Sequence, residues 1–166
     1  MKAPSGELWI HEIKHDGFRI IARKVGGVVR LQTKQGYDYA KRYPRIVDAL
    51  MRLKATSIVL DGEAMCFTGV EHDFDKLWNR IHDYEATLCA FDLLELDGED
   101  YRARPLLERK RRLFKLLKRH PAGLSTSSTW TATAPPSSSM RANSGSKASC
   151  ANASIFPIAL DRQRAG

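Results

Sequence analysis

The sequence predicts an α+β fold, in which antiparallel strands and hairpins are interspersed with a few helices. Two observations lead to this prediction: short β-branched runs separated by glycine turns, and three stretches whose apolar residues recur at helical spacing. A chain of 166 residues is long enough to bury a hydrophobic core. We therefore expect one folded domain, and the composition places its end near Gly123.

The strands are predicted from residue alternation and turn signals. Residues 7–14 form a strand that ends at an Asp-Gly turn, and residues 18–34 form a hairpin joined at Gly26-Gly27. Residues 57–67 predict strand, turn and strand, because Asp-Gly in their middle is a common turn pair. Residues 86–96 are mostly apolar, which is typical of a strand buried on both faces.

Three helices are predicted from apolar residues at helical spacing. The first covers residues 43–53 and has Pro44 at its start, where proline is well tolerated. The second covers residues 73–81 with Asp73 as its N-cap, and the third is a basic helix that starts at Pro105. The residues expected to face inward are Ile46, Leu50 and Leu53, then Phe74, Leu77, Trp78 and Ile81, and finally Leu106, Leu113 and Leu117.

The composition changes after Gly123. About half of residues 124–166 are Ser, Thr or Ala, and this segment holds one Asp, no Glu and no amphipathic period. Such a composition is typical of disorder, because it offers few side chains that could form a core. The sequence therefore predicts two parts, a folded domain over residues 1–123 and a tail over residues 124–166.

Charge and cysteine usage narrow the class of protein. The net charge of +8 favours a polyanionic partner. The three cysteines are widely spaced and form no Cys-x-x-Cys pair, so neither a disulfide framework nor a zinc site is expected. We see no apolar run long enough to span a bilayer, and we expect an intracellular protein with no membrane partner.

Three short motifs occur in a fixed order along the predicted domain. The first is EIKHDGFR, which starts at Glu12 and contains a K-x-D-G-x-R pattern; the second is LDGE, ending at Glu63; the third is CAFDLLELDG, starting at Cys89. Together they resemble the nucleotidyltransferase domain of ATP-dependent DNA ligases, especially the bacterial end-joining type. The resemblance covers about residues 7–123.

The resemblance implies a role for each matching residue. Lys14 is expected to be the nucleophile that becomes adenylated, and Glu12 is expected near the adenine. Arg19 would contact the ribose, and Glu63 would hold the ribose hydroxyl or the metal side of the site. Phe91 would stack on the adenine ring, which suits its flat apolar face.

A fold and a reaction are implied as well. The expected fold is an incomplete nucleotidyltransferase (ATP-grasp-like) domain of antiparallel sheets with flanking helices, without an OB-fold domain. The cofactors would be ATP and Mg²⁺, and AMP would pass from the lysine to a DNA 5′-phosphate before a nick is sealed. Lys34 lies where the family has an S-R-x-G segment, and a DNA phosphate contact is expected there.

The implied partners are nicked or broken double-stranded DNA and end-joining repair proteins, in a bacterial cytoplasm. Later family segments, E-G-[IV]-[IV]-x-K and W-x-K-x-K, are not found in residues 124–166, so little activity is expected of this chain alone. We hypothesise a reading-frame shift near Leu124. Residues Gly145 to Asn152 can be encoded by codons that, in another phase, spell Ile-Glu-Gly-Ile-Val-Cys-Lys-Arg. The codons of the gene would test this hypothesis.

Each motif also has an interpretation without chemistry. Lys14 could end an ordinary surface strand, and the Asp-Gly before Glu63 could make a hairpin turn that leaves this carboxylate in solvent. Phe91 could be a core residue. Arg109 to Arg112 could be the solvent-exposed face of a helix, and contact with DNA phosphates is the second interpretation of this run. For the whole chain, the alternative is a non-catalytic ligase remnant that at most binds nucleotide or DNA.

Overall fold

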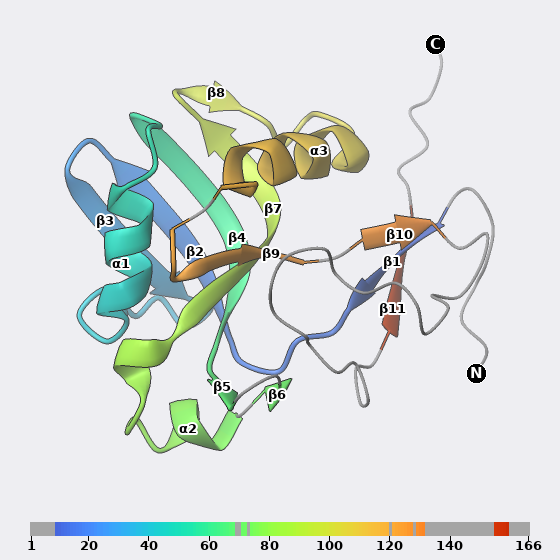
Figure 1. The fold of residues 1–166 in the computed structure, drawn as a ribbon. Helices are drawn as coiled ribbons and strands as arrows, with labels where there is room; N and C mark the ends of the chain where they lie inside the picture. Colours follow the sequence, from blue (N-terminus) through green and yellow to red (C-terminus); the bar gives the residue numbers. More distant parts are fainter. Residues whose placement is uncertain are drawn as a thin grey trace, which may run out of the picture.

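The predicted α+β class is confirmed by the computed structural model, which contains three sheets and a few helices (Figure 1). The structure describes residues 9–68, 71–72, 74–119, 121–127, 129–131 and 155–159. Within this described part, no helix is long and apolar enough to cross a membrane.

The main sheet has six strands in the order β3-β2-β4-β7-β8, with β9 parallel to β7 and all other neighbours antiparallel. The predicted hairpin is confirmed, because its two strands pair up to Val25 and Val28 on either side of Gly26-Gly27. The strands are β2 (Phe18–Val25), β3 (Val28–Thr33), β4 (Ser57–Met65), β7 (Thr87–Leu96), β8 (Glu99–Asp100) and β9 (Leu124–Thr126).

Two helices help to build the core. Helix α1 (Pro44–Met51) contacts β3, β7 and β9, and α3 (Leu106–Leu117) contacts β7 and β9. Pro44 occupies the first turn of α1 as predicted. Inward-facing residues of both helices join one hydrophobic cluster with the sheet; its fully buried members include Ile20, Leu31, Ile46, Leu50, Leu60, Leu88 and Leu93.

The short helices depart from the prediction. Helix α2 (Phe74–Trp78) is followed by a 3₁₀ turn, η1 (Asp83–Glu85), and buries only Leu77 among its own residues. Phe74, Trp78 and Ile81 are 39%, 66% and 67% exposed, so the predicted inward face is wrong for them. The helix ends at Trp78, so Ile81 lies beyond it and cannot share its buried stripe. Asp73, the predicted N-cap, lies outside the described residues.

The predicted turn at Asp61-Gly62 is also wrong, because β4 runs without interruption from Ser57 to Met65. A Cβ atom on Gly62 would lie 2.7 Å from the backbone oxygen of Cys89 on β7. Glycine is needed here for the close approach of two strands and not for a turn.

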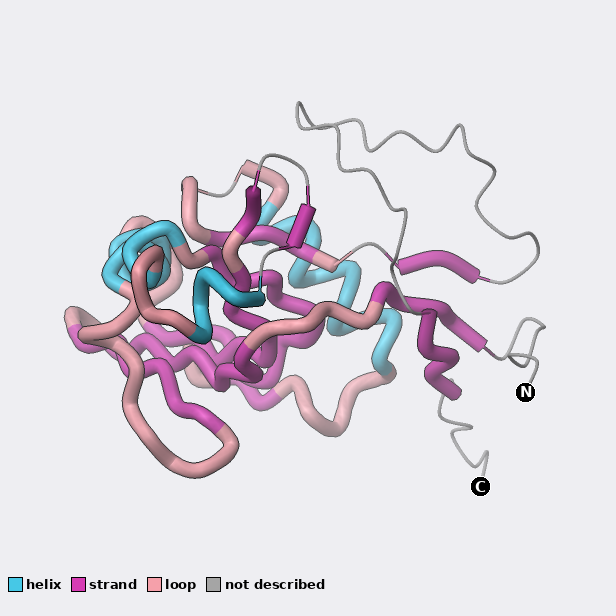
Figure 2. Tube along the Cα trace, turned by 90° about the horizontal axis from the view of Figure 1, so that it is seen from below, coloured by secondary structure: helices cyan, strands magenta, loops and turns pink. Residues whose placement is uncertain are grey.

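A second sheet is formed by β1 (Trp9–Ile13) between β10 (Thr129–Thr131) and β11 (Ile155–Ala159), and it lies to one side of the main sheet (Figure 2). A third, small sheet pairs β5 (Phe67–Thr68) with β6 (Glu71–His72). Strand β1 confirms the strand predicted over residues 7–14; it contains Glu12, where the first motif starts, and leads directly into Lys14.

The first residues after the predicted boundary at residue 123 lie against the main sheet. Strand β9 pairs with β7, and Leu124 is only 1% exposed within the core cluster. The edge of β7 has amide and carbonyl groups that need partners, and β9 supplies them although its composition is polar. Residues 129–131 and 155–159 of the predicted tail form β10 and β11. For residues 128, 132–154 and 160–166, which lie outside the described residues, the tail prediction stays a prediction.

Candidate functional site

The second and third motifs lie on neighbouring strands of the main sheet, and the arginine of the first motif lies on the next strand. Arg19 on β2 is directly opposite Glu63 on β4, which is directly opposite Cys89 on β7. Alternation along β4 puts Asp61 on the same face as Glu63, while Leu60 points into the core on the other face. Polar side chains from three strands therefore share the face that the core does not use.

Arg19 is held in a fixed position by Asp61. Its Nε and Nη2 atoms donate to the two carboxylate oxygens at 3.0 and 2.6 Å, and this pairing raises the pKa of Arg19. The guanidinium carbon lies 5.7 Å from the centre of the Phe91 ring. The structure thus brings together Arg19 and Phe91, two predicted site residues that are 72 positions apart in the sequence.

Glu63 is a half-buried carboxyl group beside the glycine of the first motif. Burial raises its pKa to about 7, and this effect is opposed by the nearby charge of Arg19 and by a hydrogen bond from the Gly17 N–H. A Cβ atom on Gly17 would lie 2.2 Å from the backbone oxygen of Ala64. The first motif can approach β4 this closely only because it carries glycine at this position. The hairpin interpretation, with Glu63 in solvent, is therefore wrong.

Phe91 owes its position to an irregularity in β7. Asp61 pairs with Asp92 and Gly62 pairs with Ala90, so the pairing of β4 and β7 skips Phe91. A second register shift skips Leu94 in the same way. Such bulges bend a strand and redirect side chains, and they are common next to functional sites. The first and last residues of the F-D-L-L motif are thus the two that leave the regular ladder.

Lys14 lies in the loop between β1 and β2, where its ammonium group forms an ion pair with Asp16. Its side chain is 45% exposed and that of Asp16 is 71% exposed, so the pair is open to a ligand. The charge of Lys14 also acts on Glu63, which places the loop beside β4. An amine held beside an acid on the rim of a polar sheet face can react once it loses its proton.

Glu12 is buried, being 8% exposed, and its partner was not expected from the sequence. Lys110 of α3 donates from Nζ to Glu12 Oε1 and to the main-chain oxygen of Phe91, the latter at 2.6 Å. A signal for Lys110 exists in the sequence. Lys110 has the same helical spacing as the inward-facing leucines Leu106, Leu113 and Leu117, so it lies on their side of the helix. The signal is easily missed, because the residues next to Lys110 are basic too.

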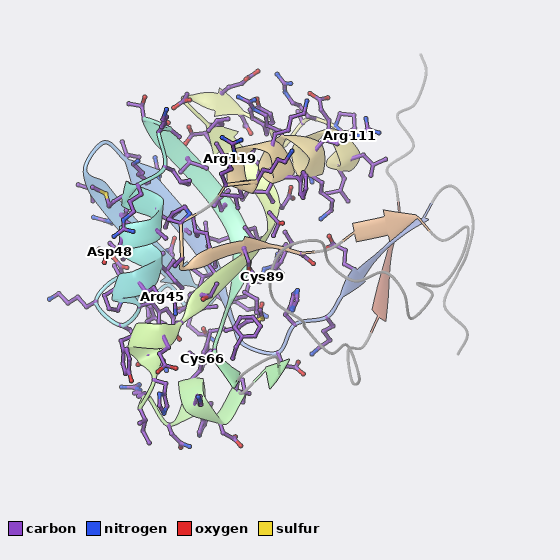
Figure 3. All side chains as sticks on the ribbon, viewed as in Figure 1. Arg45, Asp48, Cys66, Cys89, Arg111 and Arg119 are labelled. Carbon is purple, nitrogen blue, oxygen red and sulfur yellow. The ribbon has the colours of Figure 1, made fainter. Side chains whose placement is uncertain are left out.

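The interpretation of Arg109 to Arg112 as one solvated face is wrong for its first half. Arg109 donates to both carboxylate oxygens of Asp92 at 2.9 Å, and Lys110 is equally turned toward β7. Arg111 and Arg112 are exposed. Figure 3 labels Arg111 on α3 and Arg119 just beyond its end. The first two residues of the run therefore contact β7, and the last two face solvent.

Lys34 is exposed in the turn after β3. Thr33, just before it, pairs with Ile20, so Lys34 follows at the end of the sheet where Arg19 lies, one strand further out. This place at the rim is compatible with the predicted DNA phosphate contact, which stays a prediction.

Cys89 connects the loop of the first motif to β7. Its Sγ lies 3.3 Å from His15 Nε2, and the residue is only 3% exposed (labelled in Figure 3). Burial raises the pKa of Cys89 to about 12, against a smaller opposing effect of a hydrogen bond with Ser125. This thiol is protonated at neutral pH and contributes packing and not nucleophilic chemistry.

The described residues contain no group of three or more His, Cys, Asp or Glu side chains arranged to hold a metal ion. Mg²⁺ in nucleotide sites is generally bound by one or two carboxylates together with substrate phosphates. Glu63, on the same sheet face as Arg19, offers a carboxylate of this kind.

Comparison with known proteins gives one family. Residues 1–135 match the family model of the ATP dependent DNA ligase domain.

Curated relatives agree with this match. The chain is 36% identical to the multifunctional non-homologous end joining protein LigD of Pseudomonas aeruginosa over 119 residues, which is 69% of this chain and 14% of that protein. It is 38% identical to a probable DNA ligase of Sorangium cellulosum over 120 residues, covering 65% of this chain and 22% of the relative. The chain therefore spans less than a quarter of either relative.

Solved structures show the same fold. The ligase domain of LigD from M. tuberculosis matches with a TM-score of 0.64 and 29% identity, over 76% of this chain and 44% of that one. A mycobacterial DNA ligase D complexed with ATP and MES matches with a TM-score of 0.61 and 28% identity, over the same shares.

Proposed function

The chain belongs to the ATP-dependent DNA ligase family, and from this premise we propose that Lys14 is the residue to which AMP becomes attached. One observation carries the proposal: three segments far apart in the sequence converge on one polar sheet face. Arg19 contacts Asp61 and lies beside Phe91, and Gly17 donates to Glu63. Lys14, on the same loop as Gly17, forms the exposed rim of this site.

In the proposed first step, Lys14 Nζ attacks the α-phosphate of ATP. A nitrogen–phosphorus bond forms, the bond to the bridging oxygen breaks, and pyrophosphate leaves. The amine loses its proton before or during the attack, so its ion pair with Asp16 has to open. Nucleotidyl transfer depends mainly on positioning and charge neutralisation, which fits a site rich in charged side chains.

The remaining residues would hold the nucleotide. Phe91 offers a flat ring beside the Arg19 guanidinium, and we assign them to the adenine and the ribose. Glu12 is assigned to the amino edge of the adenine. Glu63 is assigned to the ribose hydroxyl or the metal side of the site.

We assign Mg²⁺ to the Glu63 side of the site, because an oxygen ligand beside substrate phosphates is the environment that this ion prefers. The ion would neutralise charge on the phosphates. Ionised Glu63 is the form that could hold it, and burial makes this form less favourable at neutral pH.

For the later steps, we propose that AMP passes from Lys14 to a DNA 5′-phosphate and that a 3′-hydroxyl then displaces AMP and closes the nick. The net charge of +8 supports a polyanionic substrate, and Lys34 is the residue we assign to a DNA phosphate. The names of LigD relatives contain non-homologous end joining, which supports broken double-stranded DNA and repair proteins as partners.

The test is covalent labelling with ATP that carries radioactive phosphorus at the α-position. We expect acid-labile label on the wild-type chain in the presence of Mg²⁺ and none on Lys14→Ala. Lys41→Ala is the matched control, because Lys41 is an exposed lysine outside the site. Its labelling should equal that of the wild type.

Label that persists in Lys14→Ala would refute the assignment of the nucleophile. A wild-type chain that takes no label and binds no ATP would support the non-catalytic remnant. Preferential labelling by GTP would contradict the assignment of ATP as the nucleotide.

A further inference from the structure

We propose that Lys110 is a positioning residue for recognition of the nucleotide base, because its single ammonium group joins the two residues assigned to that base. It donates to the carboxylate of Glu12 on β1 and to the main-chain oxygen of Phe91 on β7. The inference rests on the proposed function, which assigns Glu12 to the amino edge of adenine and Phe91 to its face.

Lys110 occupies a gap in the hydrogen bonding of β7. The outer edge of this strand pairs with β9 at residues 88–90 and with β8 at residues 95–96. Phe91 lies between these two pairings and is also the residue skipped by the register shift toward β4. Among the described residues, no strand pairs with Phe91 on this edge, and the Lys110 ammonium donates to its carbonyl oxygen at 2.6 Å.

The ion pair between Lys110 and Glu12 is buried, so losing one partner would affect the other strongly. The side chains of Lys110 and Glu12 are each only 10% exposed, so water can do little to solvate either charge. A buried carboxylate that loses its partner is strongly unfavourable and tends to move or to take up a proton. Lys110 thus holds Glu12 in place as a hydrogen-bond acceptor, which suits an amino group on the base and does not suit a carbonyl.

A second cation of α3, Arg109, connects the helix to the sheet independently of Lys110. Arg109 donates twice to Asp92 at 2.9 Å and also bonds the main-chain oxygens of Arg102 and Arg104. Lys110 reaches a different strand, β1, which carries the first motif. Arg109 therefore holds the helix on the sheet, and Lys110 orients Glu12 and Phe91.

The experiment compares ATP with purine riboside triphosphate, which lacks the amino group at position 6. The rate of enzyme labelling divided by nucleotide concentration is measured for both in the wild type, Lys110→Met, Lys110→Arg and Arg109→Met. We expect Lys110→Met to lower the preference for ATP by roughly 5–10-fold, the effect of weakening one hydrogen bond. Lys110→Arg should retain most of the preference, and Arg109→Met should melt at a lower temperature with its preference unchanged.

A second set of variants protects the test against a misfolded Lys110→Met. Glu12→Met combined with Lys110→Met removes both buried charges, and replacing both partners by apolar residues is generally tolerated. Its preference should equal that of Glu12→Met alone, because Lys110 acts through Glu12. The inference is overturned if Lys110→Met slows both nucleotides equally or neither, or if it lowers the preference further in the Glu12→Met background. If the wild type neither binds nor takes label from ATP, the proposed function fails and the inference fails with it.

Discussion

Three basic side chains at the site each form an ion pair with one acidic side chain. Arg19 pairs with Asp61, and Lys110 pairs with the buried Glu12. Lys14 pairs with Asp16 in the most exposed of the three contacts, where a ligand can compete. Glu63 lies at the same site, and burial raises its pKa. Its titration therefore predicts a pH dependence that can be measured.

The pKa of Glu63 predicts how the stability of the chain changes with pH. Burial raises this pKa from an ordinary value of 4.5 to about 7, so the folded chain binds the proton more tightly than the unfolded chain. Well below pH 4.5, Glu63 is protonated in both the folded and the unfolded chain, and it does not change the stability with pH. As pH rises from 4.5 to about 7, the unfolded chain loses the proton first, and Glu63 makes the fold progressively less stable.

The measurement is urea unfolding across this pH range, without nucleotide and with a chelator present. Glu63→Gln cannot ionise, so its free energy of unfolding minus that of the wild type should increase from pH 4.5 to about pH 7 and then level off. A difference that is constant with pH, or that decreases, would contradict the raised pKa.

The elements around the site depend on how closely β4 and β7 approach each other. The register shifts let β7 carry two extra residues, Phe91 and Leu94, past a continuous β4. Gly62 lies at the closest point, where any side chain would meet the main chain of Cys89. A glycine inside a strand usually weakens it, and here it allows the pairing that presents Phe91.

Gly62→Ala should therefore destabilise the fold. The added Cβ would lie 2.7 Å from a backbone oxygen that cannot rotate away. We expect a loss of about 1–3 kcal/mol in the free energy of unfolding, as for other overpacked sites. The midpoint of urea unfolding measures this loss.

Gly27→Ala is the matched control for Gly62→Ala, because a Cβ at Gly27 would have no heavy atom within 4 Å. Its effect should stay within about 0.5 kcal/mol, as for ordinary surface substitutions. Equal effects of the two substitutions would show that the approach of β4 and β7 is not tight.

Across the whole molecule, helices, sheet and the start of the predicted tail share one hydrophobic core. Leu124 belongs to this core with α3 residues Leu113 and Leu117, and β9 then pairs in parallel with β7. A segment of mostly small polar residues thus completes the edge of the strand that carries Phe91. The stability of the site should depend on this edge.

Leu124→Ala tests that dependence. The residue is 1% exposed, and a buried leucine reduced to alanine generally lowers the free energy of unfolding by about 2–5 kcal/mol. Val28→Ala serves as the control, because Val28 is 62% exposed and should change little. Thermal melting measures both substitutions. If Leu124→Ala has no effect on the melting temperature, the segment after residue 123 does not contribute to the core.

Local sequence patterns predicted much of the fold and one part of the site. The hairpin at Gly26-Gly27, the helix beginning at Pro44 and the basic helix α3 each depend on residues within a few positions of one another. The motifs around Lys14, Glu63 and Phe91 also stand in the sequence as contiguous residues. These features needed no knowledge of distant contacts.

What the sequence alone determined was therefore the order of local elements and the residue types of the motifs. Only the tertiary structure decided that Asp61 and Gly62 lie inside a strand, that Phe91 is the residue skipped by the pairing, and that Lys110 faces Glu12. The physical reason is the range of the interactions involved. Strand register and buried ion pairs join residues tens of positions apart, and the same Asp-Gly or lysine fits a turn or a solvated helix face equally well until its distant neighbours are in place.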